Sequence, residues 1–331
     1  MTFLVTRSSG HLGEALMRTL AARGHKALGI DNRAGAFTQR RGSITDRDFV
    51  RSCMKGVTAV LHAATLHKPH VATHSRQDFI DVNVTGTLNL LEEAASAAVA
   101  AFVYTSTTSV FGDALAPPAG EPAAWVTEEV TPVPKNIYGV TKAAAEDLCQ
   151  LFARNHALAA VVLRTSRFFP EEDDNAAVRA TFDGDNAKAN EFLYRRVDIE
   201  DVVEAHLLAA AQARVAGFAK YIISATTPFS RDDVAELPFH APQIVRRYLP
   251  DYEAEYRKRG WTMIGGIDRV YVNEKARTEL GWRPRHDFGT LIGRLRAGGA
   301  IMSPLARAIG SKGYHDRSFG DGPYPVEPHP A

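Results

Sequence analysis

The sequence predicts a doubly wound α/β fold, with a parallel sheet and a smaller, discontinuous C-terminal substrate domain. The first observation behind this prediction is that short apolar runs alternate with amphipathic stretches along the first half of the chain. Strands that are apolar on both faces indicate a parallel sheet covered by helices on both sides. The second observation is size, because 331 residues, 45% of them hydrophobic, can bury a sizeable core in two domains.

The predicted elements alternate in order along the chain. Strands are expected at residues 3–6, 27–31, 59–63, 101–105, 159–164 and 221–224. Helices are expected at residues 12–23, 77–98 and 138–154, and a strand end followed by an Ala/Leu-rich helix at 197–213. The first helix shows the reason, since Leu12, Leu16 and Leu20 recur at the spacing of one helical face.

The domain boundaries follow changes in composition. Residues 169–175 are polar and look like a loop that leaves the sheet, and from about residue 226 prolines separate short helices. Residues 310–331 are rich in glycine and proline, so we expect irregular structure there. The predicted cofactor-binding domain therefore comprises residues 1–165 and about 197–224, and the substrate domain comprises residues 166–196 and 225–331.

Charge and hydropathy exclude several classes of partner. The 39 basic residues are balanced by 38 acidic ones, so we expect neither a nucleic-acid nor a membrane partner. No apolar run reaches the roughly 18 residues of a membrane span, and the N-terminus lacks the features of a signal peptide. These observations predict a soluble, cytoplasmic protein with a small-molecule substrate.

The sequence predicts neither a disulfide nor a metal site. Cys53 and Cys149 are too few and too far apart for a disulfide framework or a zinc site. His67, His70 and His74 lie in one predicted loop, but no carboxylate or thiolate joins them at metal-ligand spacing. For His67 we expect a place in the substrate pocket, with a solvated loop as the alternative.

A glycine-bearing turn joins the first strand to the first helix, with the sequence Thr-Arg-Ser-Ser-Gly-His-Leu-Gly over residues 6–13. Gly10 and Gly13 fit the last two positions of a Gly-x-x-Gly-x-x-Gly pattern, in which the backbone approaches a pyrophosphate at the N-terminus of the helix. Arg7 occupies the position of the first glycine. Two glycines alone are also compatible with an ordinary helix N-cap.

Asp31 ends the second predicted strand, 18 residues after Gly13. A carboxylate at this place can accept hydrogen bonds from an adenosine ribose, and it repels a 2′-phosphate, so NAD is favoured over NADP. The cations Arg7 and Arg33 are close in sequence and keep NADP as an alternative. A turn-forming aspartate before Asn32 is the structural alternative.

Tyr138 and Lys142 are four residues apart at the start of a predicted helix, so both lie on one face. A lysine ammonium there lowers the pKa of the tyrosine, whose phenol can act as a general acid or base toward a carbinol or carbonyl. Hydroxyl residues at 105–109 end a strand at the carboxyl edge of the sheet, where open α/β folds bind ligands. A surface pair and a polar strand end are the simpler interpretations.

Taken together, these features resemble the extended short-chain dehydrogenase/reductase superfamily, the group of Rossmann-fold proteins that contains the NAD-dependent epimerases and dehydratases. The resemblance covers nearly the whole chain. It rests on the glycine turn, Asp31, the His-Ala-Ala sequence at residues 62–64, Asn83, the hydroxyl run, Tyr138 with Lys142, and the Leu-Gly-Trp-Arg-Pro sequence at residues 280–284.

The resemblance implies roles for the candidate catalytic residues. Tyr138 would be the acid/base and Lys142 its electrostatic partner. Aligning residues 110–112 on the family's Val-Tyr-Gly makes Thr107 the hydroxyl that orients the substrate oxygen, with Ser106 and Thr108 as the other choices. Asn83 would support a helix kink and a proton relay near Lys142.

The resemblance also implies a cofactor site and an assembly. The helices that carry Asn83 and Tyr138 commonly form a four-helix dimer interface in this group, so we expect a homodimer. The residues expected to bind the cofactor are Gly10, His11, Leu12, Gly13, Asp31, Asn32, Arg33, Ser43, Ile44, Ala63, Ala64 and Lys142.

Two departures from the family pattern bear on function. Arg7 at the tight turn either obstructs the approach of a pyrophosphate or pairs with a phosphate through its guanidinium. Residues 166–196 form a shorter segment than in many nucleotide-sugar epimerases, which is similar to uronate dehydrogenases. Arg167 stands where an asparagine is expected and could present an anion-binding fork to the substrate. Thr108 and His67 are the other residues expected near the substrate. An ion pair of Arg167 with Glu171 or Glu172 is the alternative.

The sequence therefore predicts an NAD-dependent oxidoreductase that transfers hydride at a carbinol or carbonyl carbon of a sugar or sugar-derived substrate. A nucleotide-sugar epimerase that holds NAD tightly, with no net redox change, is the alternative within the family. Dehydration is not expected, because Thr108 and Ser109 follow Thr107 where the dehydratases of this group have an Asp-Glu pair. A catalytically weak protein that senses NAD or NADP is the alternative from another class. It is considered because Arg7 replaces a glycine of the cofactor-binding turn.

Overall fold

The computed structural model describes residues 1–313, and its centre is a seven-stranded sheet in which every pairing is parallel. The strand order is β3-β2-β1-β4-β5-β7-β8, so the chain reverses direction across the sheet between β1 and β4. This arrangement confirms the predicted fold class. The strands are β1 (Thr2–Thr6), β2 (Lys26–Asp31), β3 (Arg40–Arg41), β4 (Ala59–His62), β5 (Ala101–Thr107), β7 (Ala160–Thr165) and β8 (Phe218–Ile223).

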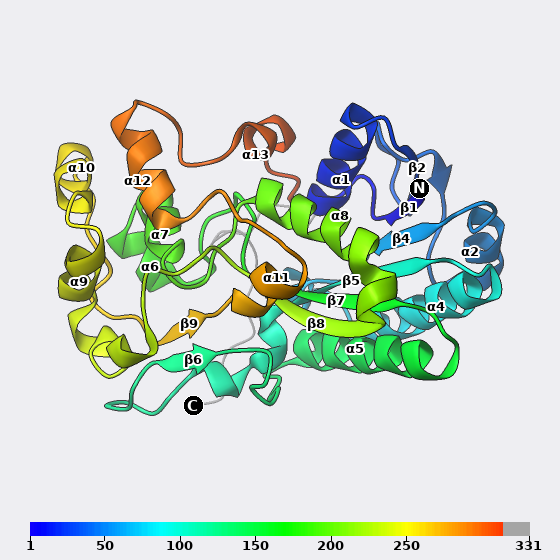
Figure 1. Ribbon diagram of the computed structural model, residues 1–331, viewed down its shortest axis with the longest axis horizontal. Helices are drawn as coiled ribbons and strands as arrows, with labels where there is room; N and C mark the ends of the chain where they lie inside the picture. The colour runs from blue at the N-terminus through cyan, green and yellow to red at the C-terminus, as the bar shows by residue number, and fades with distance from the viewer. Residues whose placement is uncertain (314–331) are drawn as a thin grey trace.

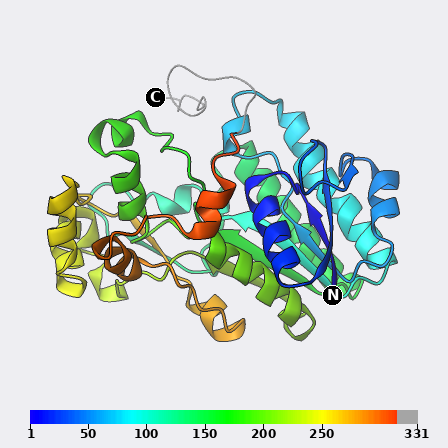
Figure 2. The ribbon, with the colours of Figure 1, turned by 90° about the horizontal axis from the view of Figure 1, so that it is seen from above.

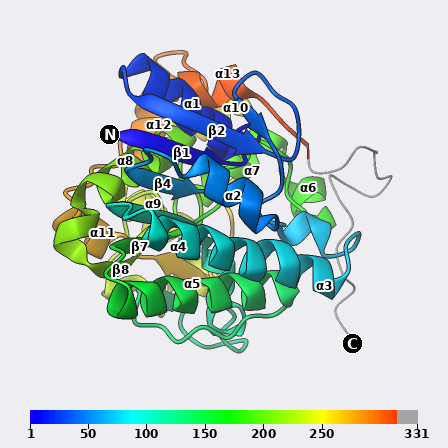
Figure 3. The same cartoon turned by 90° about the vertical axis from the view of Figure 1, so that its right-hand side faces the viewer.

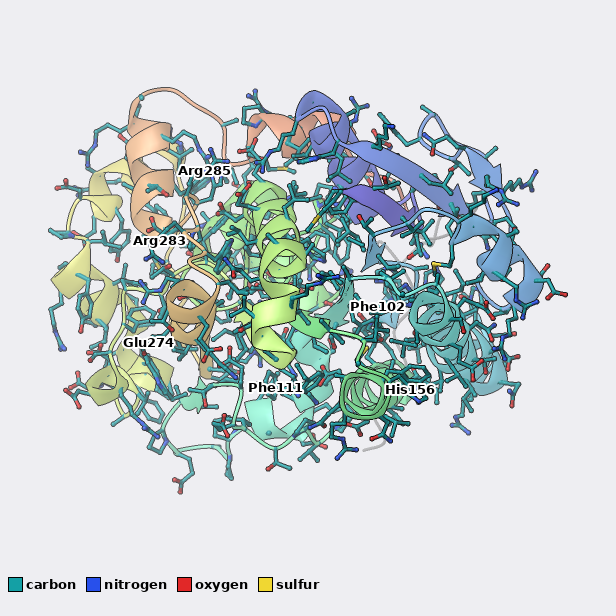
Figure 4. The ribbon with its side chains drawn as sticks, turned by 45° about the vertical axis from the view of Figure 1, so that its right-hand side comes forward. Phe102, Phe111, His156, Glu274, Arg283 and Arg285 are labelled. Atoms are coloured by element: carbon teal, nitrogen blue, oxygen red, sulfur yellow. The ribbon has the colours of Figure 1, made fainter. Side chains whose placement is uncertain are left out.

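Helices cover both faces of this sheet (Figure 1). One face packs on α1 (His11–Ala22) and α8 (Ile199–Ala216), and α13 (Pro304–Ile309), the orange-red helix of Figure 2, packs beside them. The other face packs on α2 (Arg47–Cys53), α4 (Gly86–Ser96) and α5 (Ile137–Asn155), of which α4 and α5 lie side by side in Figure 3. Phe102, fully buried on β5, belongs to the second cluster (Figure 4). Burial on both faces explains why the strands are apolar throughout.

The helix predicted at residues 77–98 is divided into three parts. α3 (Arg76–Phe79) is followed by a π-helical segment, Ile80–Thr85, and then by α4. The wider π turn carries Asn83, the residue at which the family resemblance implies a helix kink. Ala98, with φ of +51°, follows the end of α4.

A smaller half of the molecule, formed by short helices and a two-stranded sheet, lies on the left of Figure 1. It has its own apolar cluster, in which chain segments near residues 123, 190, 240 and 290 meet. Tyr256 ties two of these segments together by donating to Asn190 Oδ1 at 3.0 Å. Its elements are α6 (Ala176–Thr181), α7 (Gly184–Glu191), α9 (Leu237–Tyr248), α10 (Tyr252–Arg259), α12 (Phe288–Arg296), β6 (Ala124–Val126) and β9 (Arg269–Tyr271).

The sequence did not predict the pairing of β6 with β9. Trp125 pairs with Val270, so a segment from the predicted cofactor domain contributes a strand to the smaller half. The short elements β3 and α2 were also not predicted. The division into two domains stays a prediction, and the part of it beyond residue 313, like most of the stretch expected to be irregular at 310–331, lies outside the described residues. Among residues 1–313, no helix combines the length and apolar character of a membrane span.

Candidate active site

A cavity of about 1120 Å³ lies where the carboxyl ends of β1, β2, β4, β5 and β7 meet the smaller half. Its walls come from both halves of the molecule. Because parallel strands end at the same edge of a sheet, residues far apart in sequence line one space. The predicted residues that line it are Gly10, His11, Leu12, Gly13, Asp31, Asn32, Arg33, Ala63, His67, Ser106, Thr107, Thr108, Tyr138, Lys142 and Arg167. Ser43, Ile44, Ala64 and Asn83 lie outside this lining.

The glycine turn brings the start of α1 close to the end of β1. A Cβ added to Gly13 would lie 1.9 Å from the carbonyl oxygen of Arg7, so only glycine permits this approach. Gly10 is the N-cap of α1 and contributes no capping side chain. The first turn of a helix has N–H groups without intrahelical acceptors, and here they border the cavity. This cradle fits the pyrophosphate of a dinucleotide.

Arg7 adopts φ of +55° in this turn, the left-handed conformation that favours glycine. Its Nη1 donates a hydrogen bond to the carbonyl oxygen of Thr65, just beyond β4, at 2.7 Å. The side chain therefore crosses from one strand end to another within the cavity lining. The sequence indicated the unusual residue but not the direction in which its guanidinium points.

Asp31 is held by the glycine turn. Its Oδ2 accepts from the backbone N–H and the hydroxyl of Ser9 at 3.0 and 2.6 Å, and its Oδ1 accepts from the N–H of Arg33 at 3.0 Å. Asn32 and Arg33 follow it along the rim of the cavity. The carboxylate thus combines a turn-forming contact with a place at the cavity wall, where a ribose could reach it.

Ser43 and Ile44 make local contacts instead. The hydroxyl of Ser43 pairs with that of Thr45 at 2.7 Å, and the side chain of Ile44 packs where a Cβ of Gly86 would lie. The carbonyl oxygen of Ile44 accepts from Asn89 Nδ2 at 3.0 Å. A role of these two residues in adenine binding stays a prediction.

Tyr138 lies in the first turn of α5, which begins where the side chain of Asn136 caps the N–H of Gly139 at 3.1 Å. The tyrosine is 7% exposed and borders the cavity. Burial raises its pKa to about 12, while a hydrogen bond with Thr107 and the charge of Arg7 lower the pKa. The residue therefore needs nearby cations to release its proton near neutral pH.

Lys142 follows one turn later on the same helix and is 1% exposed. Its Nζ donates to the carbonyl oxygen of Thr105 at 2.6 Å and lies 4.1 Å from the ring centroid of Tyr104. Burial lowers its pKa to about 7, although the charge of Glu146 raises the pKa. A buried lysine whose proton is held this weakly has the perturbed pKa that marks many functional sites.

The hydroxyl residues at the end of β5 point in different directions. Thr105 pairs with His206 Nε2 of α8 at 2.7 Å, and Ser106 donates to Glu146 of α5 at 2.6 Å. Thr107, at the end of the strand, accepts from the N–H of Ser109 at 3.1 Å, and its hydroxyl forms a hydrogen bond with Tyr138 at the cavity. Of Ser106 and Thr107, only Thr107 is therefore available to a substrate oxygen.

Asn83 connects the loop after β4 to the helix of Tyr138. Its Oδ1 accepts from the Thr65 hydroxyl and the Leu66 N–H at 2.9 and 2.8 Å. Its Nδ2 donates to the carbonyl oxygen of Leu66 and to the hydroxyl of Thr141, next to Lys142, at 3.1 and 3.0 Å. The Asn83 amide does not line the cavity itself, but it holds the loop at residues 65–66 against α5, and both border the cavity.

A second buried chain of hydrogen bonds fixes the end of β4. The hydroxyl oxygen of Thr6 accepts from the N–H groups of Ala63 and Ala64 at 3.0 and 2.9 Å, so its proton goes to His62 Nδ1 at 2.9 Å. The Nε2–H of His62 then donates to Thr87 at 2.9 Å. Ala63 and Ala64 are thereby held by their backbone, which the sequence motif alone did not explain.

His67 lines the cavity between Tyr138 of α5 and Phe169 of the loop after β7. Its ring centroid is 6.2 Å from that of Tyr138 and 5.7 Å from that of Phe169. Burial lowers its pKa well below the ordinary value, and the charge of Arg7 adds to this effect. A neutral imidazole in this place can exchange hydrogen bonds with a polar substrate.

Arg167 borders the cavity, but a loop holds its guanidinium. Its Nη2 donates to the carbonyl oxygens of Glu171 and Glu172 at 3.3 and 2.6 Å, and its Nη1 lies 3.4 Å from Asp173 Oδ2. The alternative interpretation was an ion pair with Glu171 or Glu172. The guanidinium contacts the backbone of these two residues and forms ion pairs with Asp173 and Asp174. A loop that folds back on its own arginine is not visible in the spacing of the sequence.

Several lining residues were missed by the sequence interpretation. Arg195 and Arg269 come from the smaller half, and each has a buried Nε without a partner in residues 1–313. Phe168 and Phe169 flank the ring of His11, with centroids 6.0 and 5.8 Å away. Phe168 and Phe169 follow directly on Arg167, but their apolar side chains gave no signal of a polar site. For Arg195 the only signal was the adjacent pair of arginines at residues 195 and 196.

Residues 3–223 match the model of the NAD dependent epimerase/dehydratase family. The uncharacterized protein y4nG of Sinorhizobium fredii is 30% identical over 242 residues, and the match spans 68% of this chain but only 56% of that relative. A UDP-glucose 4-epimerase from Streptomyces lividans is 25% identical over 95% of this chain and 98% of that relative.

Solved structures of other proteins have a similar fold. A short-chain dehydrogenase/reductase superfamily protein from Agrobacterium tumefaciens, crystallised with bound NAD, superimposes with a TM-score of 0.62. It is 22% identical, and the match covers 90% of this chain and 98% of that protein. The doubly wound sheet and the smaller half are therefore shared over nearly the full length of both chains.

Proposed function

This chain belongs to the NAD dependent epimerase/dehydratase family, as the sequence resemblance predicted, and we propose that it is an oxidoreductase acting on a sugar or sugar-derived substrate. NAD is the cofactor of this family. The observation that carries the proposal is the convergence of Tyr138, Thr107 and Lys142 on the cavity that also borders the glycine turn. A proton-transfer group and a dinucleotide cradle in one space suit hydride transfer.

Each residue has a chemical role in this proposal. The glycine turn and Asp31 would hold NAD, which would supply the hydride acceptor for the carbinol carbon. The hydroxyl of Thr107 donates a hydrogen bond to the substrate oxygen and orients it. Tyr138 Oη takes the proton of the substrate hydroxyl as the carbonyl forms. The charge of Arg7 lowers the pKa of the phenol, and in this proposal the ammonium of Lys142, one turn later on α5, adds to that effect.

The lining of the cavity supports a small substrate that is polyhydroxylated or anionic. Lys and Arg side chains outnumber Asp and Glu side chains in its walls, and Arg195 and Arg269 face it from the smaller half. The short segment at residues 166–196 leaves less chain to grip a nucleotide diphosphate. We therefore propose a net dehydrogenase or reductase on a sugar-like compound, with Thr108, His67 and Arg167 near the substrate.

Replacing Tyr138 tests this function. In Tyr138→Phe we expect the rate to fall by about 10²–10⁴-fold, because only the proton-transferring hydroxyl is removed. The measurement is the absorbance of reduced nicotinamide with NAD and a panel of sugars, uronates and polyols. Tyr248→Phe, which removes a half-exposed hydroxyl on α9, is the control and should retain its rate. Wild-type protein that binds NAD but reduces none of it with any substrate would contradict a net dehydrogenase.

An epimerase that returns the hydride to the opposite face of the sugar is the second candidate. The observation in its favour is the full-length likeness to a UDP-glucose 4-epimerase. NAD that remains bound through dialysis, together with interconversion of nucleotide sugars, would favour this candidate. NADH that accumulates in proportion to product would favour the dehydrogenase. Protein that binds NAD without any turnover would favour the sensing protein.

We also propose that the protein is a homodimer through α4 and α5, which lie next to each other on one face (Figure 3). Val140 and Leu151 stand on one side of α5 and are 49% and 36% exposed, and Ile80 is exposed nearby. Exposed apolar side chains on adjoining helices suit an interface between copies. The molar mass in solution, measured by light scattering, tests this assembly.

A further inference from the structure

Arg7 occupies the turn at a conformational cost. Among residues 1–313, three residues other than glycine have a positive φ: Arg7 at +55°, Ala98 at +51° and Ala157 at +53°. Both alanines lie just past the ends of helices, where such a conformation is common. Arg7 lies instead at the wall of the cavity. A strained residue that persists at a ligand site indicates a function for its side chain.

The course of the side chain supports such a function. A Cβ built on Gly10 would lie 2.8 Å from Arg7 Cγ and 2.9 Å from its Nε, so the arginine stem runs directly over the N-cap of α1. Its Nη1 then reaches the carbonyl oxygen of Thr65 at 2.7 Å. The guanidinium therefore crosses the opening above the first N–H groups of the helix, where the chain favours an anion.

We propose that Arg7 anchors the diphosphate of the dinucleotide cofactor. This inference rests on the proposed function, because it requires that NAD binds at the glycine turn. The guanidinium would exchange the neutral carbonyl of Thr65 for phosphate oxygens, with which arginine forms stronger, charge-assisted bonds. Its charge would add to the backbone N–H groups of α1. In this proposal the arginine that replaces the family's glycine increases the affinity for the diphosphate and does not block its approach to the turn.

The alternative is a purely structural role, in which the hydrogen bond of Arg7 to the Thr65 carbonyl holds the ends of β1 and β4 together; we call this role a latch. The two roles predict different effects for Arg7→Gln, which keeps N–H donors for the Thr65 carbonyl but removes the charge. A latch would survive this change, and a phosphate anchor would not. Arg7→Lys keeps the charge without the planar fork, so the anchor should be weakened less.

Calorimetric titration of the protein freed of nucleotide, with NAD and with adenosine as the uncharged comparison, tests the proposal. We expect Arg7→Gln to bind NAD about tenfold more weakly and Arg7→Lys about threefold more weakly, with adenosine affinity unchanged. The affinity of Arg7→Gln for NAD should also fall less steeply with added salt than that of the wild type, since one charged contact is missing.

Matched glycine variants separate the effect of backbone strain. Arg7→Gly and Ala98→Gly both relieve a positive φ, so both should raise the melting temperature without ligand. Only Arg7→Gly should lose NAD affinity. Arg7→Gln or Arg7→Gly that binds NAD as tightly as the wild type, with the same salt dependence, would overturn the anchor and leave the proposed function standing. Wild-type protein that binds no NAD would overturn both.

Discussion

Two groups of buried charge lie one turn apart along α5 and differ in how they are satisfied. At Glu146 the carboxylate accepts from Arg164 Nη2 at 2.8 Å, from Ser106 at 2.6 Å and from Lys220 at 3.0 Å. Arg164 also stacks on the ring of Phe111, which is labelled in Figure 4, at 4.8 Å. The ammonium of Lys142, by contrast, donates to the carbonyl oxygen of Thr105 and lies over the ring of Tyr104.

The difference indicates which group serves the fold and which is available for chemistry. Each charge at Glu146 is neutralised by a partner of opposite sign, and the pKa of this carboxyl is lowered despite its burial, mainly by its hydrogen bond with Arg164. Lys142 has no carboxylate within ion-pair distance in the described residues, and burial brings its pKa to about 7. A charge that the fold leaves poorly stabilised can bind or transfer a proton at little cost.

The largest effect should come from breaking the satisfied group. Glu146→Gln leaves the guanidinium of Arg164 buried without a carboxylate, so we expect a loss of about 3–5 kcal/mol in the free energy of unfolding, measured by urea denaturation. Lys220→Met removes a partner that is partly exposed and should cost much less. A loss below about 1 kcal/mol in Glu146→Gln would show that the ion pair is not what stabilises this region.

Removing the charge of Lys142 should lower activity strongly and change stability little, the reverse of the effect expected for Glu146. For Lys142→Met we expect turnover to fall by about 100-fold, because Tyr138 loses a nearby cation, which corresponds to about 2.7 kcal/mol. The free energy of unfolding should change by less than about 1 kcal/mol, since methionine fills the space of the buried stem. Unfolding and initial-rate measurements on the same preparation check both parts. A stable variant with full activity would exclude Lys142 from the reaction.

The smallest effect concerns pH. Lys142 has a pKa of about 7 when folded against 10.5 for an ordinary lysine. Between these values the unfolded chain holds the proton and the folded chain does not, so the free energy of unfolding contributed by this residue rises with pH. From pH 7 to pH 9 we expect the wild type to gain about 2 kcal/mol relative to Lys142→Met. Parallel pH dependences of the two proteins would contradict the lowered pKa.

Much of the sheet could be predicted from local sequence. The runs at 3–6, 27–31, 101–105 and 159–164 became β1, β2, β5 and β7 with shifts of one or two residues at their ends. Apolar strands and helical spacing are properties of neighbouring residues, and they require no knowledge of distant contacts. The pairing of β6 with β9 joins residues more than 140 positions apart, which no local pattern specifies.

The candidate site divides in the same way. The sequence alone determined the doubly wound class, the glycine turn, and the placement of Tyr138 and Lys142 on one helical face, because these depend on spacings of a few residues. Only the tertiary structure decided that Ser106 turns to Glu146 while Thr107 stays available, that Arg167 is held by its own loop, and that Arg7 crosses the cavity to Thr65. Side-chain direction depends on the partners that folding brings within reach, and those partners come from helix α5, from the loop after β4 and from the smaller half.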